Sequence, residues 1–152
     1  MDLFPDSKEL LELFLARDVR FLVIGGHALA AHGIPRGTDD FDLWVWAEYG
    51  NAVKTTDALD KFGFASVGIT PADLEAPDQI IQLGTSPSRI DLLTSITGVD
   101  FEDAWRDRFE VLLDGMTVPV ISRTHLVINK WTTGRPQDLV DLMKLVRQAQ
   151  RE

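Results

Sequence analysis

The apolar run Arg20–Ile24 (RFLVI) and the residues after it constrain the fold of this chain more than any other segment. The run is rich in β-forming residues, which predicts a buried strand. It stops at Gly25-Gly26, and the Ala-rich stretch that follows ends at Gly33, as is typical of a short helix closed by glycine. Asp40–Trp46 (DFDLWVW) then alternates before becoming fully apolar, which predicts a second strand. Strand, helix and strand in so short a segment favour folds in which helices pack on a sheet.

The rest of the chain continues this alternation of helices and strands. Asp114-Gly115, between two β-rich runs, is the strongest hairpin signal in the sequence. We expect further helices at residues 6–17, 48–62, 101–106, 122–131 and 136–150, further strands at 79–83, 89–94, 109–113 and 116–120, and a loop with one helical turn at 65–78. The pattern predicts one α/β (α+β) domain spanning residues 1–152, with a mixed β-sheet flanked by helices and two C-terminal helices.

The composition fits a soluble globular domain. Of the 152 residues, 45% are hydrophobic and 26% are charged, and a domain of this length buries about 68–70% of its unfolded surface without staples. The absence of cysteine excludes disulfides, thiolate metal sites and a cysteine nucleophile. No apolar run approaches the roughly 18 residues that span a bilayer, and Met1–Pro5 does not resemble a signal peptide. We therefore expect a cytoplasmic protein with no membrane association.

Charge is unevenly distributed along the chain. The net charge is −9, with −12 over residues 1–122 and +3 over residues 123–152. An acidic protein of this kind is poorly suited to non-specific DNA binding, which needs a positive surface, and better suited to holding divalent cations. The basic C-terminal part could contact phosphates locally, although a solvated charged surface would give the same pattern.

Three carboxylates are candidates for a metal site. Asp40 and Asp42 lie two residues apart on a predicted strand, so they share one face about 7 Å apart. Asp91 lies in the apolar run RIDLL, and would complete a triad if that strand were adjacent. Three carboxylates can hold two Mg²⁺ ions about 3.5–4 Å apart for in-line phosphoryl displacement. Each aspartate taken alone would more simply be a charge at a strand edge.

Two further groups suit phosphate binding. Gly25-Gly26, between a strand and a helix, would let phosphate approach the backbone, although a tight turn explains the pair equally well. Neither GxGxxG nor a P-loop occurs. Lys130 and Arg135 could neutralise a triphosphate, with Asp138 and Asp141 orienting these cations or capping the last helix. A surface cluster of ion pairs is the alternative.

Taken together, these motifs resemble a known superfamily. The segment GGHALAAHGIPRGTDDFDLWV is similar to the signature of the DNA polymerase beta-like nucleotidyltransferases. The segments RIDLLTSITGVDFEDAW and KWTTGRPQDLVDL resemble the AbiEii-type nucleotidyltransferases of bacterial toxin–antitoxin systems and their stand-alone relatives. The resemblance covers roughly residues 20–145 and implies a nucleotidyltransferase fold.

The resemblance also implies residue roles and an activity. The catalytic metal ligands would be Asp40, Asp42 and Asp91, and the nucleotide would contact Gly25, Gly26, Arg36, Thr38, Lys130 and Asp138. Gly26 stands where many relatives have serine, so one hydroxyl contact to phosphate would be missing. The implied reaction moves an NMP from an NTP to an acceptor hydroxyl, with two Mg²⁺ ions and release of pyrophosphate. The acceptor would be a tRNA end, a protein side chain or a small molecule, and a cognate antitoxin or helical protein is an implied partner.

Two other functions compete with this interpretation. The same fold could be a catalytically silent module that binds a partner protein or RNA, although all three carboxylate positions are filled. A two-metal hydrolase is disfavoured because no suitably placed His or Glu would activate water. We expect the three histidines, which lack the spacing of metal ligands on one helix face, to be structural or surface groups: His27, His32 and His125.

Overall fold

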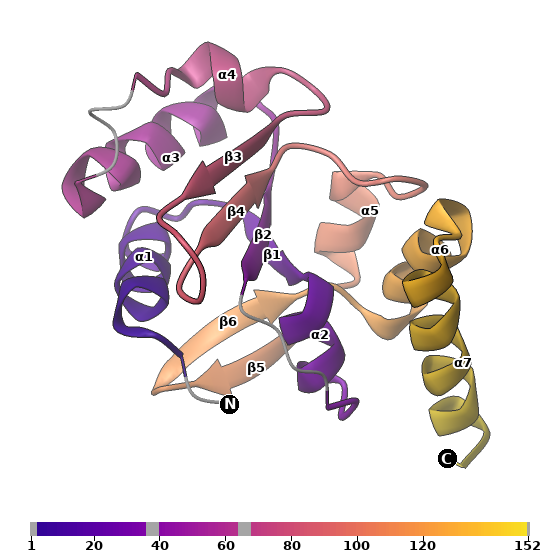
Figure 1. Cartoon of the computed structure of the whole chain (residues 1–152). Helices are drawn as coiled ribbons and strands as arrows, with labels where there is room; N and C mark the ends of the chain where they lie inside the picture. Colours follow the sequence, from indigo (N-terminus) through magenta and orange to yellow (C-terminus); the bar gives the residue numbers. More distant parts are fainter. Residues whose placement is uncertain (1–2, 36–39, 64–67, 152) are drawn as a thin grey trace.

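A computed structural model describes residues 3–35, 40–63 and 68–151. It shows an α/β protein with a six-stranded mixed sheet flanked by helices (Figure 1). In chain order the elements are α1 (Pro5–Ala16), β1 (Phe21–Ile24), α2 (Gly25–Ala31), β2 (Phe41–Val45), α3 (Tyr49–Phe62), α4 (Pro71–Glu75), β3 (Ile80–Leu83), β4 (Ile90–Leu93), α5 (Phe101–Arg106), β5 (Phe109–Leu113), β6 (Met116–Val120), α6 (Arg123–Thr133) and α7 (Pro136–Arg151).

The strand order β3-β4-β2-β1-β6-β5 puts the two strands predicted first at the centre of the sheet. β2 pairs antiparallel with β1 and parallel with β4, whereas β1 pairs parallel with β6. The end of β1 therefore lies beside the beginnings of β2 and β4. At that edge Ile24 is the register partner of Asp42, and Asp42 is the register partner of Asp91.

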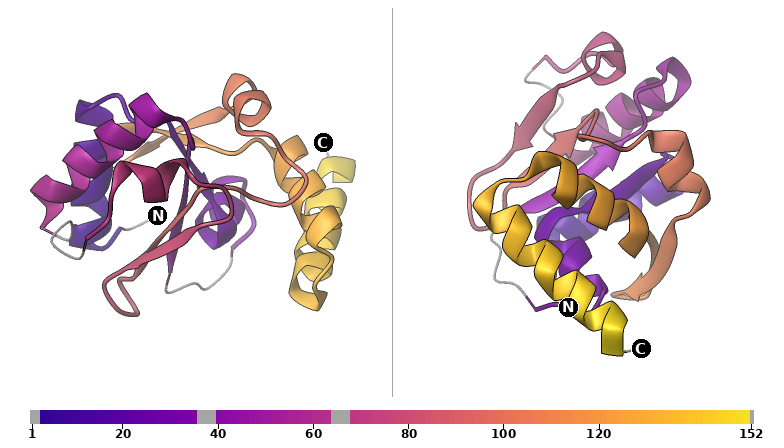
Figure 2. Two further views of the ribbon diagram at one scale, coloured as in Figure 1. Left: turned by 90° about the horizontal axis from the view of Figure 1, so that it is seen from above. Right: turned by 90° about the vertical axis from the view of Figure 1, so that its right-hand side faces the viewer.

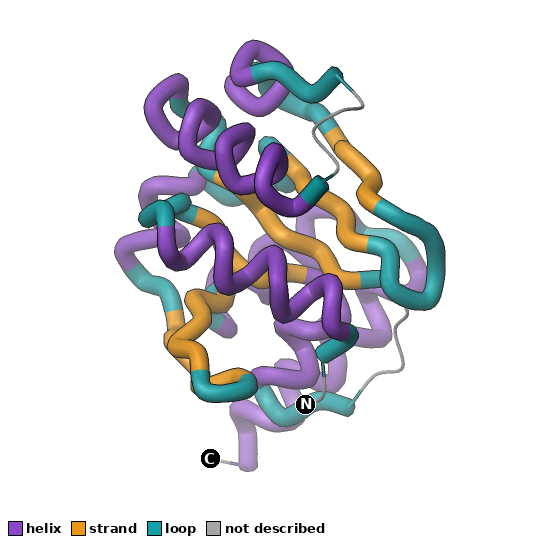
Figure 3. The backbone as a smooth tube through the Cα atoms, turned by 90° about the vertical axis from the view of Figure 1, so that its left-hand side faces the viewer, coloured by secondary structure: helices purple, strands orange, loops and turns teal. Residues whose placement is uncertain are grey.

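Helices cover both faces of the sheet. α1 and α3 lie over one face (Figures 1 and 3), where the Phe14 and Phe21 rings pack with centroids 5.3 Å apart. α2, α5 and the α6–α7 pair lie on the other side, where Trp44 of β2 meets Phe101 of α5 edge-to-face at 5.0 Å. Figure 2 shows α6 and α7 side by side as a two-helix unit. Both faces of β2 are thus buried, which explains why its second half is continuously apolar.

The predicted α/β arrangement, a mixed sheet flanked by helices with two C-terminal helices packed together, is confirmed, and the element bounds are close to those expected. β5, β6 and α5 have the predicted bounds, and Asp114 and Gly115 both have positive φ, as a tight hairpin turn requires. Ser122 caps α6 by accepting a hydrogen bond from the His125 N–H. Most other boundaries shift by one or two residues, and α2 begins earlier than expected, at Gly25 itself, so the glycine pair forms the first turn of the helix. Within the described ranges, no helix is both long and apolar enough to cross a membrane.

Leu43 is fully buried at the centre of the sheet, between Val23 and Leu92. We expect Leu43→Ala to lower the free energy of unfolding by about 2–5 kcal/mol, because it removes buried methyl groups and leaves a cavity. Urea unfolding followed by circular dichroism measures this loss. Leu112→Ala, at a side chain that is 75% exposed, is the matched control and should cost less than about 0.5 kcal/mol. Equal losses in the two variants would contradict this description of the core.

Candidate active site

The parallel pairing of β2 and β4 brings the predicted carboxylates together. Asp42 and Asp91 occupy the same register level on adjacent strands, close enough for the charge of Asp91 to help raise the pKa of Asp42. Asp40 lies just before β2, within reach of the same cluster. Because paired residues on neighbouring strands project from the same face of a sheet, the register alone accounts for this meeting of side chains.

Arg89 lies between two of these carboxylates. Its Nη2 is 2.7 Å from Asp40 Oδ2 and 3.2 Å from Asp91 Oδ2, and its Nε is 3.0 Å from Asp91 Oδ1. Sequence reasoning did not assign a role to this arginine. The signal was present, however, because residues two apart on a strand share a face, so Arg89 and Asp91 had to point the same way.

Asp42 is the carboxylate of this cluster whose pKa is raised. Burial, followed by the negative charges of Asp91 and Asp40, raises the pKa of Asp42 from 3.8 to about 6, and Arg89 offsets this only in part. Three carboxylates therefore face one guanidinium group. Counted over the described residues alone, the three negative charges outnumber the single positive charge of Arg89.

Gly25 makes the close approach of α2 to this cluster possible. Its φ of +69° lies in the left-handed region, and a Cβ atom at this position would overlap Asp42 Oδ2. Any side chain here would have to displace the carboxylate as well as adopt a strained backbone. Gly26 follows in the first turn of the same helix, so the backbone of both glycines borders the carboxylates.

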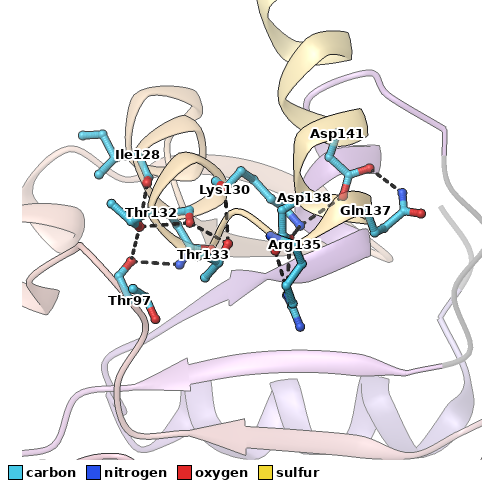
Figure 4. A network of polar contacts seen from close by, with 10 residues as sticks. Thr97, Ile128, Lys130, Thr132, Thr133, Arg135, Gln137, Asp138 and Asp141 are labelled. Carbon is cyan, nitrogen blue, oxygen red and sulfur yellow. Dashed lines mark hydrogen bonds and ion pairs between the residues drawn. The ribbon is translucent and has the colours of Figure 1, made fainter.

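A second charged cluster forms at the junction of α6 and α7 (Figure 4). Lys130 is buried, and its Nζ lies 3.2 Å from Asp138 Oδ1 and 3.1 Å from Asp141 Oδ2. Both aspartates are almost completely buried as well. Arg135 donates from Nε to Asp138 Oδ2 at 2.6 Å, while most of its own side chain remains exposed. The two positive charges equal the two negative charges in number, so these four side chains carry no net formal charge.

Asp138 positions the cations of this cluster. Burial alone would raise the pKa of Asp138, but hydrogen bonds from Arg135, Thr133 and Lys130 outweigh it and hold that pKa well below its usual range. A carboxylate engaged in this way is occupied with the protein's own cations. The resemblance predicted Asp138 as a nucleotide contact, whereas its contacts in the structure are with Lys130 and Arg135.

A cleft of about 630 Å³ lies between the carboxylates and the α6–α7 junction. A neighbouring cavity of about 550 Å³ extends it toward α2 and the start of α7. Both are lined by Gly25, Asp42, Lys130 and Arg135. Each volume lies in the range of small-molecule sites. The two groups of residues singled out from the sequence thus face shared space from opposite walls.

Sequence reasoning missed the polar wall of the larger cavity. Asn129 Nδ2 and Thr132 Oγ1 both donate to the Thr97 carbonyl, at 3.0 and 3.1 Å (Figure 4). The turn that carries Thr97 fits against α6 because Gly98 has no Cβ to meet Thr132. These contacts join residues more than thirty positions apart and leave no local pattern in the sequence.

The chemistry of the donor set fits a hard divalent cation, since carboxylate oxygens are the ligands that Mg²⁺ prefers. As arranged in this structure, however, no three His, Cys, Asp or Glu side chains among the described residues are placed to hold a metal ion. Asp40 and Asp91 instead share Arg89. Arg36 and Thr38, two predicted nucleotide contacts, lie outside the described residues.

The histidines have structural surroundings. His32 bonds the Ile121 carbonyl through Nε2 at 2.8 Å, and His125 Nδ1 lies 3.1 Å from Ser122 Oγ at the start of α6. His27 packs edge-on against Phe41, and burial lowers its pKa. These contacts agree with the structural role expected for all three.

Neither the comparison with models of protein families nor that with curated proteins returns a match to this chain. The resemblance to nucleotidyltransferases therefore stays a prediction carried by its motifs and by the geometry above.

The raised pKa of Asp42 makes stability depend on pH. Because the folded chain holds this proton up to about pH 6, against 3.8 for an ordinary aspartate, the contribution of Asp42 to stability is full below about pH 4 and is lost as the pH rises through about 6. Asparagine does not ionise, so it adds no buried negative charge as the pH rises. We expect Asp42→Asn to raise the melting temperature by several degrees more at about pH 8 than at about pH 4.5. Scanning calorimetry at both pH values measures the difference, and an equal effect at both would contradict the charge crowding described here.

Lys130 forms ion pairs with two buried carboxylates, Asp138 and Asp141, so its removal takes this partner from both. We expect Lys130→Met to lower the free energy of unfolding by about 3–5 kcal/mol. Adding Asp138→Asn and Asp141→Asn to that variant removes the buried charges and should restore most of the loss, as measured by urea unfolding. A single variant as stable as the parent protein would show that the cluster contributes little to the fold.

Proposed function

We propose that this protein is a Mg²⁺-dependent nucleotidyltransferase, which transfers an NMP from an NTP to an acceptor hydroxyl and releases pyrophosphate. One observation carries the proposal: Asp42 and Asp91, in register on adjacent strands, face Lys130 and Arg135 across a shared cleft. Carboxylates opposite cations in one concave site suit a substrate that brings both metal ions and phosphates.

The smaller cavity suits the triphosphate. Its lining combines the backbone of Gly25 and Gly26 with the side chains of Lys130 and Arg135. Arg135 is the more accessible contact, because most of its side chain is exposed although Asp138 holds both its backbone N–H and its guanidinium group. Lys130 contributes its positive charge from a fixed position, since both of its carboxylate partners are buried.

The larger cavity suits the sugar and base. It combines apolar side chains with amide and hydroxyl groups, including Leu93, Ile96, Asn129 and Thr132. A mixture of apolar lining and a few placed polar groups is characteristic of small-molecule sites. Under this proposal the α-phosphate lies where the two cavities meet, beside Asp42.

The reaction forms one bond and breaks one. The acceptor oxygen bonds to the α-phosphorus, the bond from that phosphorus to the bridging oxygen of the β-phosphate breaks, and the electron pair leaves with pyrophosphate. When bound, Mg²⁺ supplies Lewis-acid stabilisation of the phosphate charge and lowers the pKa of the acceptor hydroxyl. Asp91 takes the proton of that hydroxyl, directly or through water, and Asp40, Asp42 and Asp91 are the ligands on offer to the metal. Lys130 and Arg135 hold the negative charge that develops on the leaving group.

A second candidate is supported by Arg89. This arginine already neutralises Asp40 and Asp91 within the protein, which is the arrangement expected of a silent module that binds a partner without needing a metal. The two candidate functions differ in whether Mg²⁺ has to replace Arg89 at the carboxylates. An enzyme has to exchange the contacts of Arg89 for contacts to Mg²⁺, whereas a silent module keeps them.

Transfer of radiolabel from each α-labelled NTP, with Mg²⁺ and total RNA or cell lysate as the acceptor source, tests the proposal. We expect labelled product with at least one NTP, and a loss of roughly 10² or more in rate for Asp42→Asn and Asp91→Asn, because charge stabilisation of this kind is worth several kcal/mol. Asp57→Asn, on the exposed surface of α3, is the matched control and should leave the rate unchanged.

Thermal stabilisation by NTP separates the candidates. A nucleotide at 100 times its Kd adds about 2.7 kcal/mol to the folded state. Stabilisation that requires Mg²⁺, with labelled product, supports the enzyme. If no NTP stabilises the protein and no labelled product forms, the enzyme proposal fails and the silent module is favoured.

A further inference from the structure

The exposed charge of α7 is entirely positive along its described length. Lys144, Arg147 and Arg151 are all exposed, and their spacing of three and four residues puts them on one face of the helix. Asp138 and Asp141, the acidic residues of the described helix, are buried against Lys130. None of the three exposed cations forms an ion pair with a residue that the structure describes. This is unexpected in a chain with a net charge of −9.

These three cations line one side of a pocket of about 430 Å³. The other side is formed by the segment that follows α2, and no acidic side chain among the described residues lines the pocket. The remaining lining residues are small, apolar or neutral: Gly33, Ile34, Pro35 and Gln148. Concave space with cations on one wall and apolar groups on the other suits a ligand that carries both phosphates and flat apolar surface.

The spacing of the two walls is fixed by Gln148. Its Nε2 donates to the His32 carbonyl at the end of α2, and its Oε1 accepts from Arg123 Nη2 of α6 at 2.9 Å. Gly33 has a φ of +87°, and a Cβ there would lie 3.0 Å from Gln148 Nε2, so the close approach depends on glycine. The pocket is therefore formed by anchored elements rather than by loose surface side chains.

The same two helices connect this pocket to the candidate active site. α2 begins at Gly25 beside the carboxylates and leads to Gly33, while α7 begins at Pro136, which lines the smaller catalytic cavity (Figures 1 and 2). At 1.5 Å per residue, Lys144 lies about 12 Å and Arg151 about 22 Å along α7 from Pro136. A ligand that reaches both sites has to be elongated.

We propose that this pocket, lined by Lys144, Arg147 and Arg151, binds the phosphodiester backbone of a single-stranded nucleic acid whose terminal hydroxyl is the acceptor. The inference rests on the proposed function, since it assigns the acceptor of that reaction. At about 3.4 Å per nucleotide of a stacked strand, roughly four to six nucleotides connect the two sites. A small-molecule acceptor would not reach the basic pocket, and a protein side chain would bring no phosphates to it.

The acidic remainder of the chain restricts where such a strand can lie. Screening limits the range of its repulsion to about 10 Å at 0.1 M salt, so a local group of three cations can still attract phosphate. Elsewhere the negative surface repels the strand. The charge pattern therefore favours binding along α7 and opposes binding at other surfaces.

Fluorescence anisotropy of a labelled oligouridylate of about twelve nucleotides, without NTP and with EDTA, tests binding separately from catalysis. With three phosphate contacts, the slope of log K against log salt should be about −2, which is roughly a 20-fold loss of affinity between about 50 and 200 mM salt. We expect Arg147→Glu to weaken binding at least tenfold. Lys61→Glu makes the same charge change on the last turn of α3, on the opposite face of the sheet, and should have a much smaller effect.

Three results would overturn the inference. The first is that the oligonucleotide does not bind at low salt. The second is that Lys61→Glu and Arg147→Glu weaken binding equally. The third is that an oligoglutamate peptide of the same length binds equally tightly, which would assign this face to an acidic protein. Asp42→Asn should bind the oligonucleotide as the parent protein does, so a failure of catalysis is distinguishable from a failure of this site.

Acceptor length tests the connection between the pocket and catalysis. Arg147→Glu should raise the KM for the twelve-nucleotide acceptor at least tenfold and leave kcat and the KM for a trinucleotide unchanged, because the trinucleotide is too short to reach the pocket. An equal change for both acceptors would overturn the assignment. Oligonucleotide binding without transfer from any NTP would refute the proposed function and, with it, the acceptor role of the pocket.

Discussion

The register of β2 against β1 and β4 is the constraint on which the candidate site depends. It sets Asp42 beside Asp91 on one side and beside the end of β1 on the other, where Gly25 begins α2. A slip of one residue would turn Asp42 to the opposite face and bring Leu43 or Phe41 to the cleft. The buried, continuously apolar second half of β2 resists such a slip, because both faces of the strand are covered by helices. The packing that stabilises the core of the sheet therefore also fixes the geometry of the cleft.

Much of this arrangement follows from local sequence, and the exceptions share a physical cause. Period-2 and helical patterns predicted the strands of the described sheet and the long helices, and alternation predicted that Asp40 and Asp42 share a face. Asp91 was expected to join them only if its strand were adjacent, which the pairing of β2 with β4 supplies. The polar wall formed by Asn129 and Thr97 was not predicted, because it joins segments distant in the sequence. The association of Lys130 with Asp138 and Asp141 was anticipated from the sequence, but its burial was not, since the alternative considered was a cluster of ion pairs on the surface. Burial of a charged side chain is decided by tertiary packing, which leaves no periodic trace.

The two charged clusters use opposite electrostatic solutions. Around Lys130 and Arg135, each carboxylate has a partner of opposite sign, and the balanced cluster can be buried at the junction of α6 and α7. Around Asp42, the described residues place one guanidinium group against three carboxylates, and burial together with the charges of Asp91 and Asp40 raises the pKa of Asp42. Local stability would favour replacing one of these carboxylates by a neutral group. A crowded, uncompensated cluster at the edge of a cleft is what a site for an external cation requires, and clusters of this kind are concentrated at functional sites.

Arg89 allows two states of the site to be compared: one in which it pairs with Asp40 and Asp91, and one in which a divalent cation would take its place. In this structure it satisfies Asp40 and Asp91, so the protein is held together without an external cation. A divalent cation that binds the same carboxylates has to compete with a guanidinium group that is tethered within the site, and its affinity is lowered by the free energy of that ion pair. The competition is weakest at Asp42, because the Arg89 contacts described above are with Asp40 and Asp91, whereas burial and neighbouring negative charge raise the pKa of Asp42. Under the proposed function, a cation held beside Asp42 and Gly25 would meet the least competition from Arg89. This is also the place where the smaller cavity would hold the phosphates of an NTP, so substrate and cation would both favour displacement of the arginine from Asp91.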